Sequence, residues 1–179
     1  MSVKWDGYGI YDPGPYGPLD ALPRPEARQA FNKIMEAKPR RIEMLVNLLK
    51  ANGIVLNDDK SSIQDLNDWY RRNVAEDPSA PGRLIPDWYS VASDIGLFLG
   101  DLFIARHPVL RWEFFTWGKK NVSYQRHVIM GFGKPEWRTN LDICRQVGVY
   151  GHRIISGHEE REDNFCHWFT IVDRRVVEG

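Results

Sequence analysis

The spacing of apolar residues predicts a mostly helical chain. Near its start, the segments 24–39 and 40–53 carry apolar side chains at intervals of three and four residues, which places those side chains on one face of a helix. Pro39 lies at their junction, and proline disfavours continuation of a helix. The pattern therefore predicts two helices that form a hairpin, with Gly53 at the end of the second.

A third helix is predicted over residues 61–74, and a fourth, longer one over Asp87–Arg106. Ser61 and Gln64 have the spacing of a capping box, in which each side chain satisfies a free backbone donor at the helix start. Segment 76–86 contains proline and glycine and predicts a loop between the two helices.

The long predicted helix carries small residues on one face. Ala92, Gly96 and Gly100 recur every four residues. Glycine inside a helix costs up to about 1 kcal/mol relative to alanine, so two of them indicate a close contact. We expect another element to pack against this face, either the strand that carries Trp112 or the helical segment 147–155.

After the long helix the apolar period changes to two, the alternation of a β-strand. Residues 110–117 predict one strand and residues 123–132 a second, with the turn-forming segment 118–121 between them. Segment 140–157 predicts a helix. Segment 162–175 fits either a helix or a strand, because its centre is rich in residues that favour strands.

These elements predict an α+β fold, mostly helical, with a small antiparallel β-hairpin or sheet packed on the long central helix. A chain of 179 residues, 42% of them hydrophobic, can bury a core as one domain, here residues 26–179. Residues 1–25 are rich in proline and glycine and predict an irregular arm. Aromatic residues indicate that this arm packs on the domain: Trp5, Tyr8, Tyr11 and Tyr16.

Charge and cysteine content narrow the classes of function. Lys plus Arg and Asp plus Glu number 24 each, so no overall attraction to nucleic acid or anionic lipid is expected. The longest apolar stretch, 95–105, is interrupted by Asp101 and is too short to span a bilayer. The first residues lack the pattern of a secretory signal, and Cys144 and Cys166 have no CxxC spacing. We therefore expect a cytoplasmic protein without a membrane segment.

Three carboxylates are the candidates for catalysis. Asp94 and Asp101 lie one heptad apart on the long predicted helix, and Glu113 lies in the following strand among aromatic residues. An aromatic environment can raise the pKa of a carboxyl group into a range useful for acid–base chemistry. In the alternative, Glu113 forms an ion pair with Arg111 or Arg126 and has no catalytic role.

Segment 151–167 holds the densest group of potential metal ligands. His152 and His158 are the candidates, but they are six residues apart and match no zinc motif, so we expect a solvated charged loop and no metal or other cofactor. Cys166 and His167 adjoin in sequence, which keeps their side chains apart and argues against a nucleophile with its base. No serine-hydrolase, phosphate-loop or dinucleotide-binding motif occurs.

Basic and aromatic residues mix along the predicted hairpin. Such a mixture has the composition of a surface that binds an anion or RNA weakly. The candidate binding residues are Trp112, Trp117, Lys119, Lys120, Arg126 and His127. Because the chain has no basic total and no known nucleic-acid module, the preferred interpretation of this stretch is a solvated hairpin tip. Because the chain has no overall basic charge, no nucleic-acid partner is expected.

Segments 25–54, 66–74, 86–132 and 147–157 together resemble a bacterial family of cytoplasmic proteins of unknown function. The stretch DIGLFLGDLFIARHPVLRWE within them is also similar to wider families with an LG…GD/E…W core. Proteins of that build occur among the immunity proteins of polymorphic toxins. The resemblance implies binding to a protein and assigns no catalytic residue.

Two functions from different classes follow. The first is a protein-binding domain without chemistry of its own, for example an immunity protein that neutralises a bacterial toxin by direct binding. The second is a small enzyme or ligand-binding protein, which requires one pocket at the helix–strand junction that contains Asp94, Asp101, Glu113 and Trp112. We favour the first, because catalytic motifs are missing while Trp, Tyr and Arg are abundant.

Overall fold

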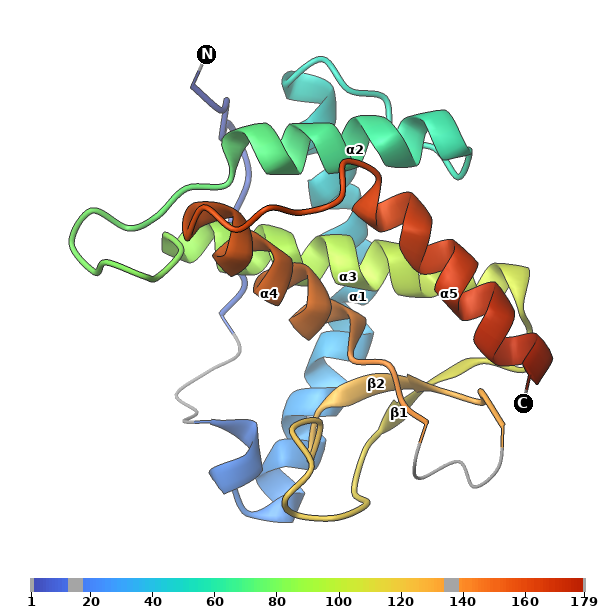
Figure 1. Cartoon of the computed structure of the whole chain (residues 1–179). Coiled ribbons are helices and arrows are strands. Elements are labelled where there is room, and N and C mark those ends of the chain that lie inside the picture. The colour runs from blue at the N-terminus through green and yellow to red at the C-terminus, as the bar shows by residue number, and fades with distance from the viewer. Residues whose placement is uncertain (1, 13–17, 134–138, 179) are drawn as a thin grey trace.

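The computed structural model describes residues 2–12, 18–133 and 139–178, and within them the fold is α+β and mostly helical, as the sequence predicts (Figure 1). The elements in chain order are η1 (Leu19–Ala21), α1 (Arg24–Ala51), α2 (Lys60–Asn73), α3 (Pro86–Arg106), β1 (Arg111–Phe114), β2 (His127–Met130), α4 (Ile143–Ile155) and α5 (Asn164–Glu178). α3 crosses the middle of the molecule. The other four α-helices surround it, and the two strands lie together at one end (Figure 1).

The first helix is a single element, so the predicted helical hairpin is wrong. α1 continues through Pro39, which lies on the exposed side. Apolar side chains on both sides of Pro39, from Ala27 to Leu49, are buried on one face. Because most helical stability in proteins comes from packing of such a face, the buried stripe maintains the helix through the proline.

The start of α2 also differs from the prediction. Asp59 is the N-cap, and its carboxylate accepts a hydrogen bond from the Ser62 N–H at 2.9 Å. The Gln64 amide donates instead to Asp68 and to the carbonyl of Glu162. The predicted capping box of Ser61 and Gln64 is therefore wrong.

The small face of α3 is packed closely, as predicted. A Cβ atom placed on Gly96 would lie 2.5 Å from Cα of Cys144 in α4. A Cβ atom on Gly100 would collide with the indole ring of Trp112 in β1. The Trp112 strand is therefore the neighbour at Gly100, as expected, whereas the neighbour at Gly96 is Cys144, which lies in α4 just before the expected segment 147–155.

By length and composition, α3 is also the one helix of the described residues that would suffice to cross a membrane. In this fold, 61% of that apolar window is buried against the rest of the chain. Its apolar residues serve the core.

The two strands are antiparallel, with Trp112 opposite Ile129 and Phe114 opposite His127. They are shorter than the predicted strands 110–117 and 123–132, and residues 115–126 form the connection between them. Ile129 also pairs with Leu141 in an isolated bridge on the other side of β2.

Segment 162–175, for which the sequence predicted either a helix or a strand, lies in the helix α5 over most of its length. Phe165 and Val172, one heptad apart, are buried, and the Phe165 ring lies 5.9 Å from that of Tyr70 in α2. Tertiary packing of this apolar stripe overrides the strand preference of the local residues.

The N-terminal arm packs on the helices. Trp5 meets the Trp88 ring edge to face at 5.3 Å, and Tyr8 reaches the α1–α3 contact. The predicted arm ended at residue 25, whereas α1 begins at Arg24. Tyr16 lies outside the described residues.

Candidate functional site

Asp94 lies in a buried ion pair that joins three parts of the chain. The Arg41 guanidinium donates to its two oxygens at 2.9 and 2.6 Å, and the Tyr8 hydroxyl donates to it at 2.5 Å. The side chains of Arg41 and Asp94 are only 6% and 1% exposed. Burial raises the pKa of Asp94, while the hydrogen bonds from Arg41 and Tyr8 oppose that rise. These bonds hold the arm, through Tyr8, to Arg41 in α1 and Asp94 in α3.

The other two candidate carboxylates lie in ion pairs of their own. Asp101 binds the Lys38 ammonium at 2.5 Å and accepts a hydrogen bond from the Trp112 indole at 2.8 Å. Glu113 accepts from Nε of Arg111 at 3.0 Å, which is one of the two pairings expected as the alternative to catalysis. The structure therefore does not bring the three carboxylates into one site.

The connection between the strands presents apolar and basic side chains to solvent. Trp117 is 51% exposed and Val122 is 67% exposed. The Asn121 N–H donates to the Gly118 carbonyl at 2.9 Å, and this turn places Lys119 and Lys120 at its exposed tip between them. We call Trp117, Lys119, Lys120 and Val122 the loop surface.

This loop is held by hydrogen bonds to the rest of the fold. Gln125 has a φ of +61°, a backbone conformation that usually requires glycine. Its N–H donates to the Phe115 carbonyl while the Phe115 N–H donates to the Arg126 carbonyl, the pattern of a β-bulge. The buried Gln125 amide donates to the carbonyls of Leu19 and Leu22 at 2.6 and 2.9 Å. These bonds tie the loop to η1 and offset the strained backbone.

The remaining predicted binding residues are partly buried and contact other parts of the fold. The Trp112 ring covers Gly100, and Arg126 forms an ion pair with the buried Asp142. Nε2 of His127 is buried without a hydrogen-bond partner among the described residues. Burial lowers the pKa of His127 to about 4. Of the predicted set, the structure places Trp117, Lys119 and Lys120 together on the surface.

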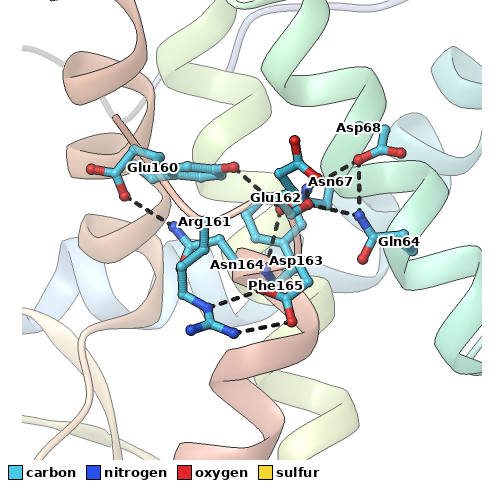
Figure 2. A network of polar contacts seen from close by, with 10 residues as sticks. Gln64, Asn67, Asp68, Glu160, Arg161, Glu162, Asp163, Asn164 and Phe165 are labelled. Atoms are coloured by element: carbon cyan, nitrogen blue, oxygen red, sulfur yellow. Dashed lines mark hydrogen bonds and ion pairs between the residues drawn. The ribbon is translucent and has the colours of Figure 1, made fainter. Parts of the chain in front are cut away.

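The charged segment before α5 is a structural connection (Figure 2). The side-chain NH₂ of Asn67 in α2 donates to the Glu162 carbonyl at 2.7 Å. The side-chain oxygen of Asn67 accepts from the Phe165 N–H at 3.2 Å. His158 is exposed, and His152 contacts the Tyr89 hydroxyl at 3.2 Å. Within the described residues, no three His, Cys, Asp or Glu side chains are arranged to hold a metal ion.

Neither cysteine has the environment of a nucleophile. Cys144 is buried, and its thiol donates to the Ser93 carbonyl at 3.4 Å. Burial raises the pKa of both thiols, Cys144 and Cys166, so the thiolate form is disfavoured.

Two features of the loop could not be predicted from the sequence, the exposure of Val122 and the positive φ of Gln125. Val122 lies between the predicted turn, 118–121, and the second predicted strand, 123–132, and only its exposure in the fold marks it as a surface residue. Gln125 carries no signal for its positive φ, because glycine is the residue that normally marks such a position.

No family model, curated protein or solved structure matches this chain.

Proposed function

We propose that this protein is a binding domain for another protein and that it uses the loop surface of Trp117, Lys119, Lys120 and Val122. The observation that carries the proposal is an exposed tryptophan and an exposed valine on either side of a turn that the fold holds in place. Tryptophan is enriched among the residues that dominate binding energy.

The rigidity of the loop favours binding. Ordering a flexible loop on association reduces affinity, and a loop ordered in advance avoids that cost. The side chain of Gln125 and the turn from Gly118 to Asn121 supply this order before a partner arrives.

The charge of the loop favours an acidic partner. Residues 114–133 contain no Asp or Glu, and Lys119 and Lys120 are exposed at the tip. Complementary charge increases the association rate and selects the partner. We propose a protein with an acidic patch around an apolar pocket, and a bacterial toxin neutralised by direct binding is the form that the family resemblance favours.

The enzyme alternative has less support. It required one pocket containing Asp94, Asp101, Glu113 and Trp112. Trp112 does contact Asp101, but the three carboxylates lie in three separate ion pairs.

The test is co-expression with each protein encoded by the neighbouring genes, followed by size-exclusion chromatography and calorimetry of any complex. We expect one acidic partner to bind, and we expect Trp117→Ala to raise the Kd at least tenfold, the loss typical of a central aromatic contact. Replacing both lysines by glutamate is expected to slow association, most strongly at low salt.

Val55→Ala is the control for truncating an exposed apolar side chain, because Val55 is an exposed valine in the α1–α2 connection and outside the loop surface. It is expected to bind as the wild type does. A partner that binds the Trp117 and lysine variants with unchanged affinity would refute the proposed surface. Neighbouring genes without toxin or secretion functions would count against the immunity role.

A further inference from the structure

A groove of about 290 Å³ lies along the seam between α3 and α4, outside the loop surface. The groove lining includes Tyr89, Ala92, His127, Arg145, Gly148 and His152. Arg145, Gly148 and His152 fall on one face of α4, since they are spaced by three and four residues. None of the described residues that line the groove is an Asp or Glu.

The middle of the groove is open because Gly148 has no side chain. A Cβ atom placed there would meet nothing within 4 Å, whereas one on Gly96 or Gly151 would collide with a neighbouring element. Helix packing thus accounts for the other two glycines and not for Gly148. Glycine disfavours a helix, so an unpacked glycine that faces a cavity indicates room for a bound group.

Polar groups stand at the two ends of the groove. At one end, the exposed Arg145 guanidinium makes no hydrogen bond or ion pair with the described residues. His127 forms part of the same wall, and its buried Nε2 has no partner. At the other end, Tyr89 contacts His152, and their rings lie 5.7 Å apart.

We infer that this groove binds a small aromatic monocarboxylate, with its ring over Ala92 and Gly148 and its carboxylate on Arg145. The apolar floor and the flanking rings suit a flat aromatic body. A free guanidinium pairs with a carboxylate through charge-assisted hydrogen bonds. The acidic group next to this end of the groove, Asp142, is buried and paired with Arg126, which reduces its repulsion of a bound carboxylate. His127 lines the wall at this end, where its Nε2 is buried.

The test is an NMR titration of the full chain with naphthalene-2-carboxylate and, separately, with its neutral amide. We expect saturable shifts of the Ala92 and Gly148 amide signals with the carboxylate and at least tenfold weaker binding of the amide. Arg145→Gln is expected to weaken carboxylate binding about tenfold, the loss of one charge-assisted contact. Gly148→Leu is expected to abolish binding, because its side chain fills the groove, and to remain folded, because its Cβ meets no neighbour.

Arg174→Gln is the control, since Arg174 is an exposed arginine on α5 and does not line the groove. It should bind the carboxylate as the wild type does. The inference is overturned if no saturable shift occurs, if Gly148→Leu still binds, or if the acid and the amide bind equally.

Discussion

Single residues decide how closely the elements of this fold approach one another. Gly100 admits the Trp112 ring onto α3, and the same indole donates to Asp101 one helical position further along. This contact joins the sheet to the central helix. Any side chain at position 100 must displace either the ring or the strand that carries it.

Gly100→Leu is therefore expected to destabilise the protein by about 3 kcal/mol, the upper part of the usual range for overpacking a core. Urea unfolding measures the change. Gly148→Leu is the matched control, since its Cβ meets no neighbour, and its stability is expected to equal or exceed that of the wild type by up to about 1 kcal/mol. An unchanged midpoint for Gly100→Leu would mean that the indole does not pack on α3 in solution.

At the scale of elements, two effects oppose each other in α1: Pro39 disfavours a continuous helix, and burial of one apolar face favours it. Proline removes one backbone donor and its ring crowds the preceding turn, yet α1 continues on both sides of Pro39. Ile34 and Leu45, before and after the proline, are both buried in the main core. The helix remains intact because breaking it would expose one half of this stripe.

Pro39→Ala is accordingly expected to stabilise the protein by up to about 3 kcal/mol, because alanine restores the donor and removes the ring contact. The side chain is exposed, so no buried contact is lost. The melting temperature should rise. A fall in melting temperature would show that the proline supports a bend that α1 needs to follow the core.

At the scale of the whole molecule, stability depends on a histidine enclosed by several elements. His127 lies in β2 opposite Phe114, and its ring is 6.1 Å from that of Trp112. Burial is the main cause that lowers its pKa to about 4, against an ordinary value of 6.5. The folded protein therefore holds this side chain neutral over a range in which the unfolded chain protonates it.

Protonation of His127 in the unfolded chain makes the stability of the protein depend on pH. Between pH 6.5 and 4 the unfolded state binds the additional proton, so the free energy of unfolding falls as the pH falls, by on the order of 3 kcal/mol in total. Urea unfolding from pH 7 to 4 measures the slope. His127→Phe removes the titrating group and keeps a ring, so its slope should be smaller. Identical slopes for the two proteins would show that His127 is not held neutral.

Local sequence patterns were sufficient to predict most of the helices and both strands of this fold. Apolar periods of three to four residues correctly predicted helices around α2, α3 and α4, and the change to a period of two predicted the pair of strands. The small face of α3 also predicted a close neighbour, because glycine inside a helix has a cost that packing must offset. These signals depend on a few residues close together in the sequence.

Contacts between distant residues decided the rest. α1 continues through Pro39, and the last segment forms the helix α5, because burial of an apolar helix face outweighs the local preference of the residues. How much such a face stabilises a helix depends on the distant elements that pack against it. Asp94 is paired with Arg41, which lies 53 positions away in the sequence. This long-range contact gives the candidate catalytic carboxylate a structural role. The fold likewise exposes Trp117 and encloses His127, although both lie in one short basic and aromatic stretch. Sequence alone therefore determined the chemistry available in that stretch, and tertiary structure decided which side chains reach solvent, because burial depends on elements far away in the chain.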